Sequence, residues 1–470
     1  MKIASGSPKW ICCQLGAREH YAIPRALHRD HALDQLITDA WVRPSSLLRI
    51  GGVRSSEIGG RWHEELKQAV VTSFNSSLVG FEMLARARRL RGWPLIMARN
   101  KWFERKVVDW LRRNADTLKA EKLKTKEPRT EKLEGNAEEL KSASGSDEPT
   151  PRRETLKTEL IIFAYSYAAR QIFRFAKRRG WKTVLGQIDP GPVEEKIVAE
   201  EGARVPELGG DWQPAPPEYW DNWQEECSLA DHIIVNSEWS RACLVEARVN
   251  GSKLSVIPLA YEMPDNSLRP IRAYPPACKT NGLEAAPVGE PITRAYPARF
   301  TPDRPLRALF LGQVNLRKGV ARLFEAIRQL KDEPIEFQFV GPMQVAVPED
   351  LKNNVRVRWI GTVPRATTSD FYRDADVLIF PTLSDGFGLT QLEAQAHRFP
   401  VIASRYCGEV VKHGVNGLLL DQPTVDAIVE ALRFCLADPA RVAAFSNASR
   451  IEDRFSIDTL AQNLLRLVNT

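Results

Sequence analysis

Residues 380–393 read FPTLSDGFGLTQLE, and this stretch is the most informative part of the chain. It begins at the end of an apolar segment, residues 376–380, which has the composition of a buried strand. A loop with Gly386 and Gly388 follows, and a helix is expected to begin near Thr390. Glycines allow the backbone to approach a ligand closely, and the N–H groups at a helix start can bind an anion such as phosphate.

Two acidic residues flank this loop. Asp385 precedes the first glycine, and Glu393 lies one turn into the expected helix, on the side that can face the same ligand. Asp385 taken alone has a second explanation, which is that it caps the loop by accepting backbone hydrogen bonds. Two carboxylates beside a phosphate-binding backbone suit a ligand that carries both hydroxyl groups and a diphosphate. A nucleotide sugar is a ligand of this kind.

The alternation of apolar strands with helices predicts two domains of the α/β class, and 470 residues are enough for both. We expect doubly wound, Rossmann-like domains at residues 1–262 and 305–470, joined by a linker at residues 263–304. Ligands of such folds bind beyond the carboxyl ends of the strands, so the cleft between the domains is the expected site. Residues 33–42 fit a strand or a helix equally well. The other strands are expected at residues 10–15, 160–165, 183–188, 230–236, 254–259, 307–312, 337–340, 355–360, 376–380 and 400–403.

Two segments of the first domain depart from this pattern. Residues 115–159 have almost no aromatic or β-branched apolar side chains, so they cannot bury enough surface to offset the entropy of ordering. We expect an inserted, disordered loop there. Residues 86–113 are basic and have a helical stripe of apolar residues, which fits either a packed helix or a face that lies on anionic lipid. The stripe consists of Phe103, Val107, Trp110 and Leu111.

The composition favours a reduced compartment and anionic partners. The chain has seven cysteines without CxxC spacing, and this argues against a disulfide framework or a zinc site. No group of histidines has metal-ligand spacing, so neither a metal nor another cofactor is expected. The net charge of +7 suits nucleotides or lipid phosphates, although an ordinary solvated surface explains it equally well. The charges are dispersed and lack the aromatic modules of RNA-binding proteins, so we expect no nucleic-acid partner.

The sequence also bears on location. No signal peptide is evident at the N-terminus. The longest apolar run, residues 160–169, is far shorter than the roughly 18 residues that span a bilayer. We therefore expect a cytoplasmic protein, either soluble or peripheral to the inner face of the membrane.

Three further segments point to the same site as residues 380–393. Residues 310–319, FLGQVNLRKG, read as a strand and a glycine turn that precede a helix. Residues 339–342, FVGP, are a strand that ends in a glycine turn, and residues 411–419, VKHGVNGLL, are a glycine-rich turn before a buried strand. Each is a weak signal alone, because many α/β proteins have such turns. Together they closely resemble the retaining glycosyltransferases of family 4, which have the GT-B fold.

The resemblance is specific over residues 307–421 and thinner in the first half. There it rests mainly on residues 230–241, ADHIIVNSEWSR, and residues 253–259, KLSVIPL. It implies GT-B architecture, with an acceptor-side N-terminal domain and a donor-binding C-terminal domain.

The resemblance also implies roles for single residues. The family's two acids fall on Asp385, which would contact donor-sugar hydroxyls, and Glu393, which would hold the nucleotide ribose. Lys318 would pair with the diphosphate, where a positive charge stabilises the charge of the departing nucleoside diphosphate. The implied donor-sugar group is Asp385, Gly386, Phe387 and Gly388, and the implied diphosphate group is Arg317, Lys318, Gly312, Leu389 and Thr390.

The chain departs from the family pattern in three places. Asp385 stands where glutamate is usual, and it is one methylene shorter. Gln313 stands where an arginine often follows the glycine of the phosphate turn, and Arg317 is a candidate substitute. The acceptor-side histidine of the family has no clear match. Ser166 and Asp189, at neighbouring strand ends, are the acceptor-side candidates.

The sequence therefore predicts a retaining glycosyltransferase that moves a sugar, most simply a hexose, from a nucleotide-sugar donor to a hydroxyl acceptor. The resemblance to the family implies a glycan or lipid-linked acceptor, in cell-envelope or exopolysaccharide synthesis. The alternative is a non-catalytic nucleotide-sugar-binding protein on the same fold, and Asp385 and Gln313 are the reasons to consider it. Fold alone does not decide between these.

Overall fold

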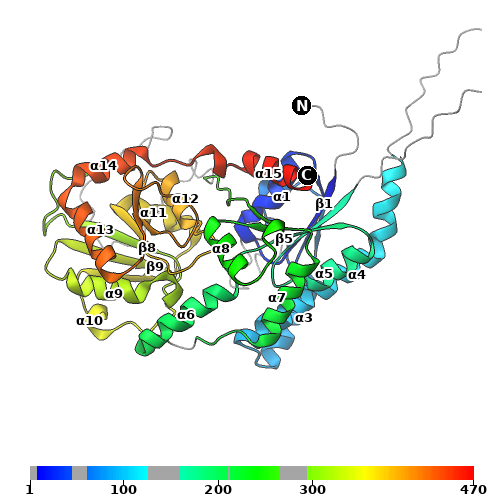
Figure 1. The fold of residues 1–470 in the computed structure, drawn as a ribbon, viewed down its shortest axis with the longest axis horizontal. Coiled ribbons are helices and arrows are strands. Elements are labelled where there is room, and N and C mark those ends of the chain that lie inside the picture. The colour runs from blue at the N-terminus through cyan, green and yellow to red at the C-terminus, as the bar shows by residue number, and fades with distance from the viewer. Residues whose placement is uncertain (1–7, 45–60, 125–158, 210–211, 264–293, 470) are drawn as a thin grey trace, which may run out of the picture.

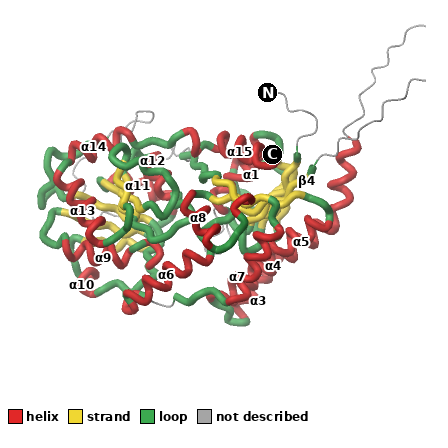
Figure 2. The backbone as a smooth tube through the Cα atoms, viewed as in Figure 1, coloured by secondary structure: helices red, strands yellow, loops and turns green. Residues whose placement is uncertain are grey.

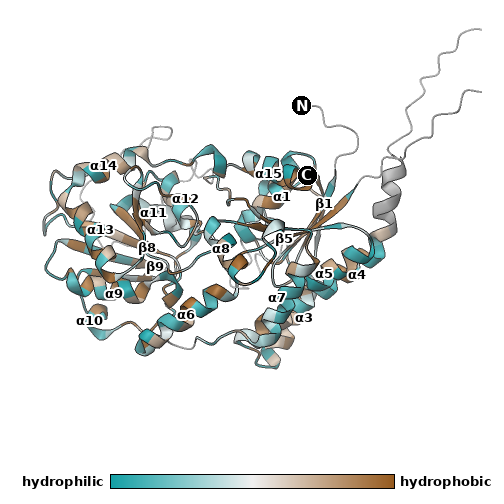
Figure 3. Ribbon diagram, viewed as in Figure 1, coloured by the Kyte–Doolittle hydropathy of each residue, from teal (hydrophilic) through white to brown (hydrophobic). Residues whose placement is uncertain are grey.

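The computed structural model describes residues 8–44, 61–124, 159–209, 212–263 and 294–469. These residues form two parallel sheets, each flanked by helices on both faces (Figure 1, Figure 2). The strands are the most apolar parts of the chain, and helices of mixed character surround them (Figure 3). Parallel sheets need this arrangement, because both of their faces must be covered.

The first sheet has the strand order β3-β2-β1-β4-β5-β6-β7. Its order reverses between β1 and β4, and the fully buried sequence LIIFAY forms β4. Ligands of doubly wound folds bind at such a switch point. The strands are β1 (Lys9–Gln14), β2 (Leu33–Thr38), β3 (Val71–Ser73), β4 (Leu160–Tyr165), β5 (Lys182–Gly186), β6 (His232–Val235) and β7 (Leu254–Val256).

The second sheet has the order β10-β9-β8-β11-β12-β13, with its switch point between β8 and β11. Its strands are β8 (Leu306–Leu311), β9 (Ile335–Val340), β10 (Val357–Gly361), β11 (Val377–Phe380), β12 (Val401–Ser404) and β13 (Gly417–Leu420). The predicted α/β class and the two doubly wound domains are confirmed. Residues 33–38 are a strand, and β3 was not predicted.

Helices connect the strands of both sheets. In the first half they are α1 (Ala22–Arg29), α3 (Asn75–Ala87), α4 (Gly92–Lys124), α5 (Arg170–Arg178), α6 (Pro192–Arg204), α7 (Pro217–Leu229) and α8 (Glu238–Glu246). In the second half they are α9 (Val320–Gln329), α10 (Glu349–Lys352), α11 (Thr368–Asp374), α12 (Thr390–Ala396), α13 (Val425–Ala437), α14 (Pro439–Ala448) and α15 (Ile457–Asn469). None of the helices that the structure describes has the length and apolar character needed to cross a bilayer.

The last helix returns to the first domain. The buried residues Leu460, Ala461 and Leu464 of α15 pack in the same core cluster as Ala26 and Leu27 of α1. Figure 1 shows the red α15 beside the blue α1. The last helix of the predicted C-terminal domain, residues 305–470, thus buries its apolar face against the N-terminal domain.

The structure corrects one prediction for α4 and the segment after it, and decides between two alternatives for another. The helix continues to Lys124, and Ala115 is fully buried, so the insertion predicted at residues 115–159 begins later. Residues 125–158 lie outside the described residues. In the apolar stripe, Phe103, Val107 and Leu111 are buried in the core, so this stripe is not a lipid-facing surface.

Candidate functional site

The turn after β8 places two cations at the switch point of the second sheet. The Asn315 side chain accepts a hydrogen bond from the backbone N–H of Lys318 at 3.1 Å and so closes this turn. Gly319 follows with φ +73°, and a Cβ there would lie 2.0 Å from the carbonyl oxygen of Pro381. Only glycine fits this position. The turn is thereby fixed against the strand end of β11, and Arg317 and Lys318 point to the loop that follows β11.

Lys318 forms an ion pair with Asp385 and lies 4.6 Å from the centroid of the Phe380 ring. Arg317 lies 3.7 Å from Asp385 and 3.7 Å from Glu194 on α6, so it joins the two halves of the chain. Burial opposes the charge of Asp385, but Lys318 and Arg317 outweigh it and lower the pKa of this carboxyl group. Burial raises the pKa of Glu194 to about 8, although Arg317 opposes this. The structure therefore brings together the predicted residues Lys318, Arg317 and Asp385.

The glycine loop lies against the N-terminal domain. A Cβ on Gly386 would come within 2.2 Å of the carbonyl oxygen of Ile188, the residue before Asp189. The carbonyl oxygen of Gly386 accepts hydrogen bonds from Ser237 Oγ at 2.8 Å and Ser240 Oγ at 3.1 Å, at the start of α8. The loop that the sequence singled out is thus also a contact between the domains.

The other residues of this loop differ in what they can offer a ligand. Gly388 has φ +80° and approaches the ring of Phe380 so closely that a Cβ would lie 2.6 Å from it. The Phe387 side chain is buried in an apolar cluster with Phe455, so only its backbone is available to a donor. Leu389 directly precedes α12, and Thr390 is its first residue, as predicted.

Glu393 occupies a separate part of the site. It accepts hydrogen bonds from Arg365 at 2.8 Å and from the hydroxyl of Tyr372 at 3.1 Å, and burial raises its pKa. Arg365 also contacts the ring of His20 on the first domain. Burial lowers the pKa of His20 to about 3, so the ring is neutral there at pH 7. Glu393 thus has its own cation, distinct from Lys318 and Arg317.

The turn around Gly312, predicted to bind phosphate, packs closely against Gly341. Gly312 has φ +142° with open space around its Cα, and a Cβ on Gly341 would lie 1.9 Å from the Gly312 carbonyl oxygen. Gln313, the departure from the family pattern, is exposed. Arg317 is half-buried instead, beside Asp385, and its role as the substitute cation near the donor stays a prediction.

The acceptor-side candidates lie at the strand ends of the first sheet. Asp189 Oδ1 accepts hydrogen bonds from Tyr167 Oη at 2.5 Å, from Gly191 N at 2.9 Å and from Gln187 Nε2 at 3.1 Å. Ser166 is buried, and its hydroxyl has no hydrogen-bond partner among the described residues. Both residues line a cavity of about 120 Å³ in the N-terminal domain.

A larger cavity of about 700 Å³ lies between the two halves of the chain. Its lining includes Asp189 and Glu194 from one side and Arg317 from the other, but not Lys318, Asp385 or Glu393. Its size is within the range of small-molecule sites, about 300–1,000 Å³. Glu194, Tyr167 and Arg365 were not predicted, because single polar or aromatic residues outside a glycine motif carry no local signal. Within the described residues, no cluster of histidine, cysteine or carboxylate side chains is arranged to hold a metal ion.

The carboxyl-terminal half of the chain is similar in sequence to known glycosyltransferases. Residues 295–452 match the family described as glycosyl transferases group 1. The D-inositol 3-phosphate glycosyltransferase of Xylanimonas cellulosilytica is 35% identical over 175 residues, which are 35% of this chain and 42% of that protein. The protein of the same name from Kribbella flavida is 28% identical over 245 residues, 49% of this chain and 54% of that protein. The chain thus spans about half the length of the curated relatives that it matches.

Solved structures align with almost the whole chain. Anabaena Alr3699/HepE in complex with UDP-glucose has a TM-score of 0.54 at 14% identity, and the alignment covers 98% of this chain and 99% of that one. Sucrose-phosphate synthase from Thermosynechococcus elongatus has a TM-score of 0.52 at 17% identity and 98% coverage of both chains. The chain as a whole therefore has the GT-B fold. In its carboxyl-terminal half, residues 295–452 match the family of glycosyl transferases group 1, in agreement with the predicted resemblance to family 4.

Proposed function

We propose that this protein is a retaining glycosyltransferase that moves a sugar from a nucleotide-sugar donor to a hydroxyl group of an acceptor. The observation that supports this most is the group of Lys318, Arg317 and Asp385, which lies at the switch point of the second sheet and meets the N-terminal domain at Glu194. Buried cations at this place suit a diphosphate leaving group, since they stabilise the charge that develops as it departs.

In the proposed reaction, the bond between the sugar's anomeric carbon and the diphosphate oxygen breaks. The acceptor oxygen then bonds to the anomeric carbon on the same face, and its proton passes to the departing phosphate oxygen. Arg317 and Lys318 hold the diphosphate, Asp385 binds donor-sugar hydroxyls once Lys318 turns to the phosphate, and Glu393 holds the ribose. The contact of Gly386 with Ser237 keeps the domains together and excludes water, which limits hydrolysis of the donor.

A UDP-sugar is the first donor to test, because the solved structure of Alr3699/HepE is a complex with UDP-glucose. We propose that no bound metal is needed, since Lys318 and Arg317 supply positive charge at the diphosphate. The decisive experiment incubates the protein with UDP-, GDP- and ADP-sugars and a mixture of hydroxyl acceptors. The anomeric configuration of any product, read by NMR, tests retention, and an unchanged rate in EDTA tests the proposal about metals.

The second candidate is a non-catalytic nucleotide-sugar-binding protein. The ion pair of Lys318 with Asp385 favours it, because both side chains are satisfied by each other and a donor has to separate them. Binding of a nucleotide sugar without hydrolysis or transfer, across the whole donor and acceptor panel, would support this candidate.

We further propose a cytoplasmic protein that works on a glycan or lipid-linked acceptor at an anionic membrane, in cell-envelope or exopolysaccharide synthesis. The surface that supports membrane contact is on α3, whose apolar side chains Val79, Met83 and Leu84 are 52%, 67% and 50% exposed. The exposed residues Arg86, Arg88 and Arg89 follow directly. Apolar side chains beside arginines suit the surface of an anionic bilayer.

A further inference from the structure

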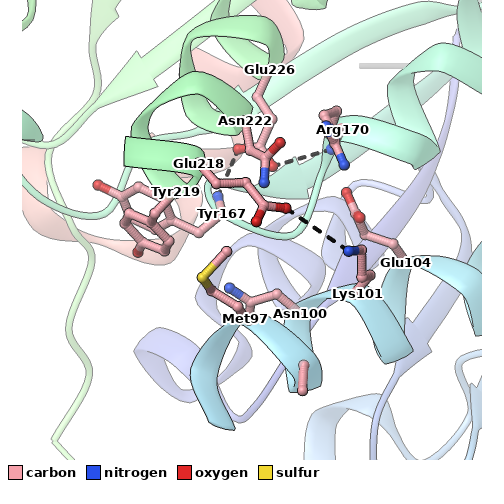
Figure 4. A pocket seen from close by; sticks show the side chains of 11 residues that line it. Met97, Asn100, Lys101, Glu104, Tyr167, Arg170, Glu218, Tyr219, Asn222 and Glu226 are labelled. Atoms are coloured by element: carbon pink, nitrogen blue, oxygen red, sulfur yellow. Dashed lines mark hydrogen bonds and ion pairs between the residues drawn. The ribbon is translucent and has the colours of Figure 1, made fainter. Parts of the chain in front are cut away.

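A stacked pair of tyrosines forms a wall that three cavities share. The rings of Tyr167 and Tyr219 are nearly parallel, with centroids 4.7 Å apart and planes 18° apart. Both residues line the 700 Å³ cavity between the domains and two cavities of about 290 and 120 Å³ within the N-terminal domain. Figure 4 shows the 290 Å³ cavity with the two rings side by side at its edge. A molecule bound in any of these three cavities could therefore contact the tyrosine pair.

Tyr167 is held there in an unfavourable backbone conformation. Its φ is +74°, in the left-handed region that side chains other than glycine rarely adopt. Its backbone N–H donates to Glu226 Oε2 at 2.6 Å, and its hydroxyl donates to Asp189 Oδ1 at 2.5 Å. Strain that the surroundings enforce in this way gathers at binding sites. The two carboxylates thus fix the position of the Tyr167 ring.

More aromatic rings continue this wall. Tyr219 lies 4.8 Å from Trp93 and 5.2 Å from Trp220 between ring centroids. We call Trp93, Tyr167, Tyr219 and Trp220 the aromatic wall. All four side chains line the 700 Å³ cavity and are half-buried. The face of an aromatic ring carries partial negative charge, so it attracts the polarised C–H groups on the flat face of a sugar ring.

The wall also has a hydrogen-bond acceptor at its edge. The carboxylate of Asp189 uses only Oδ1 in its hydrogen bonds with the described residues, and Asp189 lines the same cavity as the wall. Its Oδ2 can therefore accept a hydrogen bond from a hydroxyl at the rim of a sugar ring. A C–H face against aromatics and a hydroxyl on a carboxylate are the two contacts that a neutral sugar needs.

The same region offers few hydrogen-bond donors to a phosphate group. The N–H groups at the start of α5 would be the natural phosphate site, but the protein's own carboxylates fill it. Ala169 N and Arg170 N donate to Glu226 at 2.9 and 3.1 Å, and Gln171 N donates to Glu104 at 3.0 Å. Glu104, Arg170 and Glu226 line the cavity of Figure 4.

The charges in the two larger cavities also disfavour an anion, whereas Arg18 lines the smallest cavity. In the 290 Å³ cavity, Arg170 lies 3.8 Å from Glu225, which compensates its charge. Lys101 in the 290 Å³ cavity lies 3.9 Å from Glu218, which compensates its charge. Among the described residues that line the 700 Å³ cavity, the carboxyl groups of Asp189 and Glu195 face a single cation, Arg317, and Glu194 adds a third carboxyl group that keeps its proton up to a pKa of about 8. Arg317 lies near the expected donor diphosphate, so it is not free for a second phosphate.

We propose that the acceptor presents an uncharged sugar ring, packed with its C–H face on the aromatic wall and with one hydroxyl on Asp189, and that phosphorylated acceptors are excluded. This inference rests on the proposed function and names its acceptor class. It distinguishes this chain from relatives whose names include inositol phosphate.

The test measures binding as well as transfer. In the presence of UDP, saturation-transfer NMR compares methyl glycosides of glucose, galactose and N-acetylglucosamine with the 6-phosphates of the same sugars. We expect at least one methyl glycoside to bind and its phosphate to bind more weakly. Trp93→Ala should weaken the glycoside about five- to tenfold, the effect of losing one aromatic contact. Trp93→Phe should restore most of the binding.

Two controls keep the outcomes apart. Phe434→Ala removes a 42% exposed aromatic ring of the other domain and should change nothing. UDP binding, measured by calorimetry, should be equal in all variants. Equal or tighter binding of the sugar phosphates, or no effect of Trp93→Ala, would overturn the proposal about the acceptor. A failure of the wild type to bind UDP or any UDP-, GDP- or ADP-sugar would instead overturn the proposed function.

Discussion

Ser237 donates a hydrogen bond through Oγ to the carbonyl oxygen of Gly386 at 2.8 Å, across the boundary between the two domains. The same hydroxyl accepts a hydrogen bond from Ser240 N at 3.1 Å and so caps helix α8. One side chain therefore secures a helix of the N-terminal domain and the glycine loop of the C-terminal domain. The two domains meet at the residues that the sequence marked as the donor site.

Gly386→Ala should disrupt the contact between the glycine loop and the N-terminal domain. The added methyl group would lie 2.2 Å from the carbonyl oxygen of Ile188, so the backbone or the domain must shift. Overpacking of this kind costs roughly 1–3 kcal/mol. We expect a lower Tm and a larger radius of gyration in solution scattering. Gly80→Ala, at an open position on α3, is the matched control and should be neutral or slightly stabilising. Identical melting of the two variants would contradict the tight contact.

Lys318→Ala should weaken the binding of nucleoside diphosphate about ten- to a hundredfold, because a hydrogen bond to a charged group contributes roughly 1.5–3 kcal/mol. The nucleoside without phosphates should bind as it does to the wild type. Calorimetry with both ligands is the measurement, and Lys331→Ala, at an exposed lysine, is the control. Equal losses for both ligands would show that Lys318 has only a structural role.

The same variant should also be less stable than the wild type. Lys318 pairs with Asp385 in a buried position, and breaking a buried ion pair costs roughly 3–5 kcal/mol. Urea unfolding of Lys318→Ala, with and without Asp385→Asn, measures this cost. The second substitution should recover part of the loss, since it removes the uncompensated charge.

Glu393→Ala should weaken both nucleoside and nucleoside diphosphate, by about tenfold, because both carry the ribose. The side chain also holds Arg365 at 2.8 Å, so Arg365→Ala is the companion variant. If Arg365→Ala alone reproduces the whole loss, Glu393 acts by positioning the arginine. If neither variant changes affinity, the ribose is bound elsewhere.

Stability should fall with rising pH, and Glu194 should contribute to this fall together with Glu226, since burial raises the pKa of Glu226 to about 8 as well. Burial raises the pKa of the Glu194 carboxyl group from 4.5 to about 8, so between these pH values the folded chain keeps a proton that the unfolded chain releases. The free energy of unfolding therefore decreases as pH rises through this window. Glu194→Gln mimics the protonated form and should flatten the decrease. Urea unfolding at both ends of the window is the measurement, with Glu200→Gln, an exposed position on α6, as control.

Binding to anionic vesicles should depend on α3. The wild type should sediment with vesicles that contain phosphatidylserine at low salt and less at high salt, since salt screens the arginines. Met83→Glu should reduce this binding. Val355→Glu makes the same change at a 92% exposed residue of the other domain and should have no effect. Equal binding to neutral and anionic vesicles would contradict the proposal.

The sequence predicted the strands and the donor-side loops because their signals are local. The segment VLIF before a loop with Gly386 and Gly388, and the turn before Gly319, can be recognised without knowing any partner. The contacts of these loops could not be predicted in the same way. Nothing near Glu393 in the sequence points to Arg365, and nothing near Arg317 points to Glu194, because such pairs depend on how distant segments fold together.

Tyr167 illustrates a second limit. Strand β4 ends at Tyr165, but the next helix, α5, begins only at Arg170. The left-handed conformation of Tyr167 prevents the helix from beginning earlier. Tyrosine rarely adopts this conformation, so the sequence does not predict it. The buried carboxylate of Glu226 enforces it from more than fifty residues away, by accepting the Tyr167 N–H. A strained residue of this kind becomes visible only in three dimensions.

The return of α15 to the first domain has a consequence for anyone who recombines such proteins. A hybrid that exchanges the donor-binding half at residue 305 would bring a foreign last helix onto α1, where Leu460 and Leu464 are buried and Arg29 lies 3.2 Å from Asp458. A hybrid that exchanges only residues 305–456 keeps α15, residues 457–469, with the N-terminal domain against which it packs.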